Sequence, residues 1–297
     1  MLEAGIAERF SAGSLNYDNQ ATVQYRMAQA FAEWLASTPA GAAKPRPDAI
    51  ATNRLGSHAL DANTLGSNAL DSDTVNSKIS DLQTLHIVEL GCGTGFLTQQ
   101  MLARFPYATI DACDVSADML TQCHIRNQAT KQGSRPDAIR LHQADAAAFS
   151  TGRSSDWTVS SFCLQWISDL RGALQFHAQQ TRRLSICVPC SASFTDWKDA
   201  HASVGLQAAL WPLPRADKLT QWMQNIADTN NGHLRSKVMM VSEHHDSPLA
   251  FVRHFRAIGA DYTGGKSTGA ALKRVLGKLP SPYDAQYEVL MLDLVLR

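Results

Sequence analysis

Residues 85–114, LHIVELGCGTGFLTQQMLARFPYATIDACD, decide the fold of this chain. The first six residues, 85–90, form a short apolar run that predicts a buried parallel strand. Three glycines follow at alternate positions: Gly91, Gly93 and Gly95. A helical pattern and a second strand, residues 108–113, then lead to Asp114. A strand, glycine turn, helix and strand, with an acid about 20 residues beyond the glycines, is the layout of a nucleoside-binding site.

The glycine spacing indicates which nucleoside ligand fits. Glycine lets the backbone turn sharply and approach a ligand closely because it has no Cβ. A dinucleotide site uses G-x-G-x-x-G, whereas this chain has G-x-G-x-G with Glu89 just before it. This arrangement resembles motif I of the class I S-adenosylmethionine (SAM) methyltransferases, whose ligand is cationic and has no pyrophosphate. We expect Asp114 to accept hydrogen bonds from both ribose hydroxyls, and Glu89 to hold the turn or face a cationic ligand. The alternative is a glycine-rich turn without function in another α/β protein.

The composition excludes several function classes. The 297 residues are enough for one large α/β domain or two small ones, and 27 basic residues balance 27 acidic ones. A net charge of zero gives no sign of broad binding to nucleic acid or to a membrane surface. No run is apolar enough to span a bilayer, and the N-terminal residues lack the pattern of a secretory signal. We therefore expect a cytoplasmic protein.

Cysteine and histidine positions give no metal site. The six cysteines lie mostly in predicted strands, which favours reduced thiols in the core. Cys187 and Cys190 have the spacing of a redox or zinc pair, but no second pair accompanies them. His244 and His245 are adjacent on a predicted strand, so they point to opposite faces and are poorly placed to share one ion.

The chain divides into three segments. Residues 1–37 form an N-terminal lead-in that is irregular at first and continues as an amphipathic helix over residues 20–36. The resemblance to methyltransferases makes this helix the expected lid of the cofactor site, and the alternative is a helix that only packs against the sheet. Residues 38–80 carry two copies of a polar decamer and predict an inserted flexible loop. Residues 81–297 form the methyltransferase domain, with substrate-binding segments within residues 191–280.

The remaining pattern predicts an α/β, Rossmann-like class I methyltransferase fold: a seven-stranded, mostly parallel sheet with an antiparallel last strand. The further strands are expected at residues 138–144, 157–164, 184–190, 236–243 and 288–296. The further helices are expected at residues 116–128, with Ser116 as N-cap, and at residues 170–181, 193–210, 248–260 and 270–276. Asp145 and Ala146 follow the third strand, where an acid and the adjacent backbone usually meet the adenine of the cofactor.

A more specific resemblance covers nearly the whole chain apart from the inserted loop. Phe10 and Tyr17 resemble an F-(x)-Y lead-in, and SFCLQW, residues 161–166, is similar to an N-x-x-x-Q-W segment. FVRHFRAIGA, residues 251–260, looks like an L-(K/R)-x-I-G-A segment, and YEVL from Tyr287 resembles a T-Y-x-x-(L/F) strand. In this order the segments resemble the malonyl-acyl carrier protein O-methyltransferases of early biotin synthesis. The chain departs from that pattern at Ser161, where Asn is usual, and in lacking a Pro-Gly-Gly turn before the fifth strand.

The resemblance implies a methyl transfer from SAM to the free carboxylate of a malonyl thioester, giving the ester that starts biotin synthesis. Acyl carrier protein or coenzyme A would carry the malonyl group. A carboxylate with a pKa of about 4 is already ionised at pH 7, so positioning in a dry site suffices and no general base is needed. Arg253 and Arg256 are the candidate partners of the carboxylate, because Arg binds carboxylates bidentately. The expected pocket wall consists of Tyr17, Gln165, Trp166 and Tyr287.

Two other functions stay open. Another class I methyltransferase, acting on a different small carboxylate or on a hydroxyl, would share every feature up to Asp145 and differ in the C-terminal half. A degenerate copy kept as an inactive binding partner would explain Ser161, but it would have no reason to keep the intact cofactor motif. For each of Arg253 and Arg256 the alternative is a solvated surface residue, and for Trp166 it is core packing.

Overall fold

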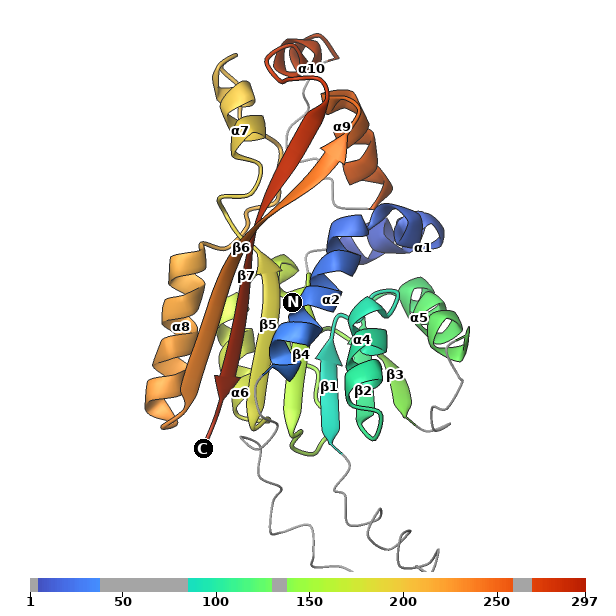
Figure 1. Ribbon diagram of the computed structural model, residues 1–297, viewed down its shortest axis with the longest axis vertical. Coiled ribbons are helices and arrows are strands. Elements are labelled where there is room, and N and C mark those ends of the chain that lie inside the picture. The colour runs from blue at the N-terminus through green and yellow to red at the C-terminus, as the bar shows by residue number, and fades with distance from the viewer. Residues whose placement is uncertain (1–4, 38–84, 130–137, 259–268) are drawn as a thin grey trace, which may run out of the picture.

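A computed structural model describes residues 5–37, 85–129, 138–258 and 269–297 (Figure 1). The predicted inserted loop, residues 38–80, lies outside the described residues, so its flexibility stays a prediction.

One seven-stranded sheet organises the described residues (Figure 1). Its strands are β1 (His86–Leu90), β2 (Thr109–Asp114), β3 (Ile139–Gln143), β4 (Trp157–Ser161), β5 (Arg183–Pro189), β6 (His233–His245) and β7 (Tyr283–Val295). They lie in the order β3-β2-β1-β4-β5-β7-β6. Strands β1 to β5 pair in parallel, and β7 runs antiparallel to both of its neighbours. The predicted fold class is therefore confirmed.

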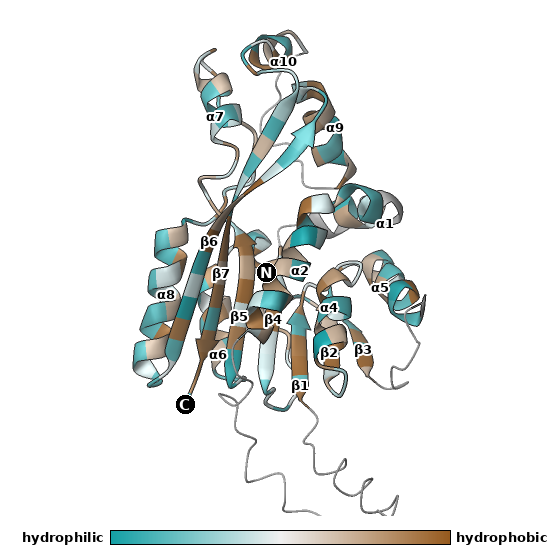
Figure 2. Cartoon of the chain, viewed as in Figure 1, coloured by the Kyte–Doolittle hydropathy of each residue, from teal (hydrophilic) through white to brown (hydrophobic). Residues whose placement is uncertain are grey.

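Helices cover both faces of the sheet. They are α1 (Ile6–Gln20), α2 (Thr22–Ala36), α4 (Phe96–Arg104), α5 (Ala117–Ala129), α6 (Leu170–Ala178), α7 (Thr195–Ala202), α8 (Ala216–Thr229), α9 (Pro248–Ala257) and α10 (Gly269–Leu276), with a short 3₁₀ turn η3 (Leu164–Trp166). Alternate residues of a strand point to opposite faces, so Ile87 belongs to the core under α2 and α4, and Val88 and Leu90 belong to the core under α6 and α8. Burial on both faces explains why β1 is a largely apolar run, and Figure 2 shows β1 and β5 mostly in brown, whereas β4 between them is paler. In the described part of the chain, no helix combines the length and hydrophobicity that crossing a membrane would require.

The prediction of an irregular start is wrong, because α1 occupies residues 6–20. Its sequence contains Gly13 and several Ser and Asn residues, which favour a helix weakly, and no side chain caps its N-terminus. Contacts with α5 and α9 hold the helix instead, and sequence periodicity does not reveal such contacts. The bend at Ala21 then joins α1 to α2, the predicted helix over residues 20–36.

Two elements end well before their predicted boundaries, and one helix was not predicted. The fourth strand ends at Ser161, because Phe162 takes a left-handed φ of 55° and η3 follows. The predicted helix over residues 193–210 ends at Ala202 as α7, and Gly205 follows with a φ of 73°, a conformation that commonly ends helices. Helix α8 was not predicted, although its apolar side chains repeat at helical spacing toward the core.

The strands β6 and β7 extend beyond the other strands. β7 pairs with β5 over Val289–Val295, whereas its preceding residues pair with β6 alone among the described strands. Helices α7, α9 and α10 lie around this projecting part (Figure 1). We call the projecting ends of β6 and β7, with these three helices, the overhang. Aromatic rings pack at its base, where the ring centroids of Phe194 and Tyr287 are 4.6 Å apart.

Candidate active site

The glycine turn after β1 borders a cavity at the carboxyl ends of the parallel strands, which we call the glycine-turn cavity. Gly91, Gly93 and Gly95 have φ angles of 65°, 53° and 89°, a left-handed conformation that favours glycine. A Cβ on Gly91 would lie 2.1 Å from the Sγ atom of Cys163, whereas a Cβ on Gly93 would have no heavy atom within 4 Å. Gly91 is therefore required for packing, and Gly93 leaves open space for a ligand.

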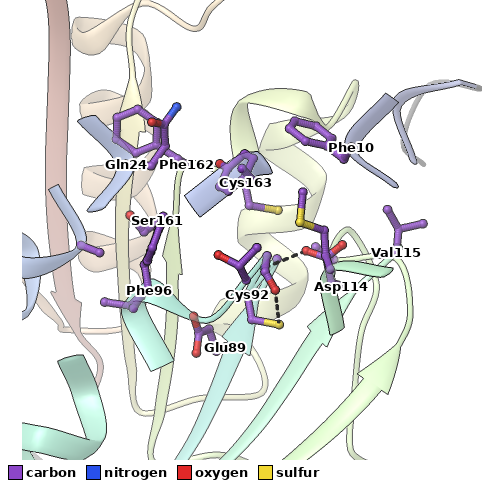
Figure 3. Close-up of a pocket in the computed structure, with 18 of the residues that line it drawn as sticks. Phe10, Gln24, Glu89, Cys92, Phe96, Asp114, Val115, Ser161, Phe162 and Cys163 are labelled. Carbon is purple, nitrogen blue, oxygen red and sulfur yellow. Dashed lines mark hydrogen bonds between the residues drawn. The ribbon is translucent and has the colours of Figure 1, made fainter. Parts of the chain in front are cut away.

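Asp114 lies where the sequence predicts it, at the end of β2 beside the glycine turn (Figure 3). Its Oδ2 accepts a hydrogen bond from the N–H of Gly93 at 2.9 Å, and its Oδ1 accepts one from the N–H of Ser116 at 2.9 Å. Burial raises the pKa of Asp114, and the backbone N–H groups oppose that rise. A carboxylate has about four acceptor positions, so each oxygen keeps capacity for a ligand hydroxyl.

Glu89 lines the same cavity and is only 1% exposed. The hydroxyl of Thr98 donates to its Oε2 at 2.7 Å. Burial nevertheless raises the pKa of Glu89 to about 8. The carboxyl group is thus mostly protonated at neutral pH, and a nearby cation would favour its ionised form.

Helices α1 and α2 cover the glycine-turn cavity. Phe10, Tyr17 and Gln24 line it from this side. Phe10 and Tyr17 are seven residues apart on one face of α1, whereas Gln24 lies on α2 beyond the bend at Ala21 and was missed by the sequence analysis. The predicted lid helix, α2, buries most of its inner side in the core, so α1 contributes at least as much to the cover.

Asp18 fastens α1 to the glycine turn. Its Oδ1 accepts a hydrogen bond from the hydroxyl of Thr94 at 2.6 Å, and its Oδ2 forms an ion pair with Arg126. Arg126 also donates to the carbonyl oxygen of Thr94 at 2.8 Å, and its guanidinium lies 4.3 Å from the ring centroid of Phe96. The cover is therefore attached to the residues that form the cofactor motif.

The rest of the glycine-turn cavity comes from the ends of β2, β3 and β4. Ala146 lines it as predicted. Asp145 is not among the lining residues, and its Oδ1 accepts a hydrogen bond from the N–H of Ala147 at 2.9 Å. The lining residues that the sequence analysis missed include Val115, Met119, Phe162 and Cys163. The cleft holds about 760 Å³ of space outside protein atoms, a volume that includes space open to solvent.

A second cavity, which we call the aromatic cavity, adjoins the first. The two cavities share Gln24, Phe162 and Trp166 as lining residues. Gln165 and Tyr287, both predicted as pocket residues, line the aromatic cavity only. Most of its other lining side chains are apolar: Pro189, Phe194, Leu210, Trp211, Leu213, Phe255 and Ile258. The structure thus brings Tyr17, Gln165, Trp166 and Tyr287 to two adjoining cavities.

A buried carboxylate lies behind the aromatic cavity. The hydroxyl of Tyr287 donates to the Oε2 of Glu243 at 3.1 Å, and Thr22 donates to the other oxygen. The Nε2 atoms of His245 and His254 lie 3.4 Å and 3.2 Å from the same Oε2. Burial raises the pKa of Glu243, but the facing imidazoles and the Thr22 hydroxyl outweigh it and hold the pKa well below its usual range. Glu243 therefore joins β6 to β7, α9 and the start of α2.

Arg253 and Arg256 lie away from both cavities. Both side chains are exposed on α9, and neither is among the described residues that line the glycine-turn cavity or the aromatic cavity. The structure therefore does not bring them to the other predicted site residues, and their contact with a substrate stays a prediction.

Comparisons with known proteins agree with this geometry. Residues 87–182 match the family described as a methyltransferase domain. The chain is 28% identical over 264 residues to the biotin biosynthesis bifunctional protein BioCD of Bordetella avium, with 87% of this chain and 44% of that protein covered. It is 27% identical over 195 residues to the malonyl-[acyl-carrier protein] O-methyltransferase of Magnetococcus marinus, with 63% of this chain and 68% of that protein covered. The chain thus spans less than half of the bifunctional relative and about two thirds of the second one.

Solved structures support the fold. The YcgJ protein of Bacillus subtilis superposes with a TM-score of 0.52 at 10% identity, covering 76% of this chain and 99% of that protein. A candidate methyltransferase of Bacillus halodurans superposes with a TM-score of 0.51 at 9% identity, with the same coverage of 76% and 99%.

The residues of the glycine-turn cavity fit SAM. At Gly93 the backbone borders open space without an intervening side chain, and Asp114 has two oxygens that can accept hydrogen bonds from a ribose. Glu89 ionises readily beside a cation, and Phe10, Met119 and Trp166 supply apolar surface for a purine. The matching domain and the observed sheet order agree with these features. The chain has the class I methyltransferase fold, its residues 87–182 match a methyltransferase domain, and it is similar to the malonyl-[acyl-carrier protein] O-methyltransferases.

Proposed function

We propose that the chain methylates the free carboxylate of a malonyl thioester, carried by acyl carrier protein or coenzyme A, and that the ester enters biotin synthesis. The observation that carries this proposal is the aromatic cavity, which adjoins the cofactor site through Gln24, Phe162 and Trp166. A mostly apolar lining excludes water from an acceptor held there. The names of the curated relatives support malonyl as the acceptor group.

The proposed chemistry needs little from the protein beyond placement. SAM supplies an electrophilic methyl group on a positively charged sulfur. A carboxylate oxygen forms the new bond to the methyl carbon, the electron pair of the methyl–sulfur bond goes to sulfur, and no proton moves. The side chains of Tyr17, Gln165, Trp166 and Tyr287 would hold the acceptor in line and keep water out. Glu89, the three glycines, Asp114 and the Asp145–Ala146 backbone would hold the cofactor.

Arg253 and Arg256 keep a proposed role at the acceptor. Their exposure on α9 supports contact with the surface of an acidic carrier protein better than contact with a carboxylate inside the aromatic cavity. Helices α7, α9 and α10 all fall within residues 191–280, the segment proposed to bind the substrate.

Methyl transfer from labelled SAM to malonyl-acyl carrier protein tests the proposal. Acetyl-acyl carrier protein is the control, because it lacks the free carboxylate but keeps the carrier and the thioester. Ester formation on the malonyl form alone supports the function. SAM binding without transfer to any malonyl thioester would refute it.

A second acceptor class has one observation in its favour. Among the described residues that line the aromatic cavity, none is Lys or Arg. This lining would also suit a neutral hydroxyl acceptor or another small carboxylate that brings apolar surface of its own. Transfer to such an acceptor, with none to malonyl thioesters, would establish this alternative.

A further inference from the structure

Gln24 is a polar residue on an otherwise apolar surface. It lies on α2, whose inner side consists of the buried residues Val23, Met27, Ala28, Phe31, Ala32 and Leu35. Gln24 lines both the glycine-turn cavity and the aromatic cavity, and Figure 3 shows its amide beside Phe162. Phe162 offers no hydrogen-bonding side-chain atom and Trp166 offers one donor, so Gln24 brings an amide donor and acceptor to the boundary between the cavities.

The amide of Gln24 is not satisfied by the protein. Its Oε1 atom is buried and has no hydrogen-bond partner within the described residues. A buried polar atom without a partner opposes folding, so such atoms are rare in proteins. A Met side chain would fill similar space at this position without that penalty. The unpaired amide therefore points to a partner that arrives with a ligand.

Nearby polar groups are already committed. Gln165 donates through Nε2 to the carbonyl oxygen of Phe162 at 2.8 Å, and Trp211 donates to the carbonyl oxygen of Gln165 at 2.6 Å. The hydroxyl proton of Tyr287 is directed to Glu243. The Oε1 of Gln165 also lacks a partner, but Gln165 lines the aromatic cavity alone. At the boundary of the two cavities the donors are the indole N–H of Trp166 and the amide of Gln24, and Gln24 is the one whose side chain has a buried atom without a partner.

We propose that Gln24 is the residue that positions the methyl acceptor, by donating a hydrogen bond from its amide Nε2 to one acceptor oxygen. The other oxygen is then left free to attack the methyl carbon. Because Oε1 has no hydrogen-bond partner within the described residues, a half-turn of the amide exchanges Oε1 and Nε2 and presents Nε2 to the acceptor. This inference rests on the proposed function, since it assumes an oxygen acceptor in the aromatic cavity.

Two substitutions test the role of Gln24. Gln24→Met keeps the length and removes the amide, and Gln24→Glu replaces the donor with a negative charge. We expect kcat/KM for the malonyl thioester to fall about 10- to 100-fold in Gln24→Met, the usual range for losing a hydrogen bond to a charged group, and further in Gln24→Glu. Gln29→Met is the matched control, because Gln29 is exposed on the same helix and its amide contacts Glu33 at 3.3 Å.

Measurements without turnover separate positioning from structure. The Kd for SAM should stay within about threefold of wild type, and the Tm of Gln24→Met should be unchanged or higher, because an unpaired buried amide is removed. Binding of malonyl-pantetheine to the enzyme loaded with S-adenosylhomocysteine should weaken in parallel with kcat/KM. A purely structural Gln24 would instead lower Tm and SAM affinity together, and that result would overturn the inference.

The same assays distinguish failure of the inference from failure of the proposed function. If wild type methylates the malonyl thioester and both Gln24 variants match it, the function stands and the role of Gln24 is refuted. If wild type methylates only other small acids or hydroxyl compounds, the malonyl function falls. The variants are then compared on the accepted compound, where equal rates overturn the inference and a selective loss supports it.

Discussion

Gly91 and Gly93 are two residues apart in the same turn, yet substitution by Ala should affect different properties of the protein. Gly91→Ala should lower the free energy of unfolding, because its Cβ would lie 2.1 Å from the Sγ and 2.4 Å from the Cβ of Cys163. Gly93→Ala should leave a folded protein that binds SAM poorly, because its Cβ has no neighbour within 4 Å and Gly93 lines the cofactor cavity.

The magnitudes follow from the geometry. Both glycines have φ in the left-handed region, 65° and 53°, so either substitution should cost about 1–2 kcal/mol in backbone strain. At Gly91 the overlap with Cys163 adds overpacking, which typically costs about 1–3 kcal/mol. We therefore expect Gly91→Ala to be destabilised by about 2–5 kcal/mol and Gly93→Ala by the strain alone.

Urea denaturation and calorimetry of SAM binding measure the two effects. Adding Cys163→Gly removes both clashing atoms, so Gly91→Ala should cost only the strain in that background, and the double-mutant cycle should give a coupling of about 1–3 kcal/mol. The reasoning is refuted if Gly91→Ala is as stable as Gly93→Ala, or if Gly93→Ala binds SAM with the affinity of wild type.

Three further predictions concern charged groups. The pKa of Glu89 is raised to about 8. Its contribution to the free energy of unfolding is therefore fully present at acid pH and is lost as the pH rises to about 8. Urea titrations should show this decline in wild type but not in Glu89→Gln, and SAM affinity should rise toward pH 8 in wild type only. The pKa of Glu243 is lowered, so its contribution to folding stability is present at pH values above the usual pKa of a carboxyl group and is lost in acid. Glu243→Gln should therefore destabilise the protein by about 3 kcal/mol at pH 7. An unchanged denaturation midpoint in this variant would contradict the prediction. Arg253→Ala and Arg256→Ala should raise KM for malonyl-acyl carrier protein several-fold and leave KM for malonyl-pantetheine unchanged. Equal increases for both acceptors would instead place the arginines at the carboxylate.

The sheet could be predicted from sequence because its signals are local. β1 is a continuous apolar run followed by glycines, and Asp114 stands directly after the next strand. The order of the parallel strands was not predicted, because the rules on connections restrict the possible orders without selecting one. The cofactor half of the site also depends on local signals. The turn after β1 and the end of β2 place the backbone nitrogen of Gly93 2.9 Å from Oδ2 of Asp114.

The acceptor half depends on contacts between distant segments. Helix α1 forms because it packs on α5 and α9, not because its own residues favour a helix strongly. Gln24 reaches the boundary of the two cavities only because α2 lies against the sheet in one particular orientation. Arg253 and Arg256 matched a family segment, but a segment match does not say which face of α9 is exposed. The helical state of α1, the place of Gln24 and the exposure of the two arginines can therefore be read only from the tertiary structure.

The polar contacts of α1 and α2 with later segments of the chain have a consequence for synthesis on the ribosome. Helix α1 and the start of α2 emerge first, but their partners come much later: Arg126 for Asp18, Glu243 for Thr22 and His254 for Gln20. Translation therefore leaves the first two helices without their partners until most of the chain has been made. A nascent chain stalled before β6 can form the nucleoside-binding turn, but it cannot dock its first helices fully, so complete closure of the site follows the synthesis of β6 and α9.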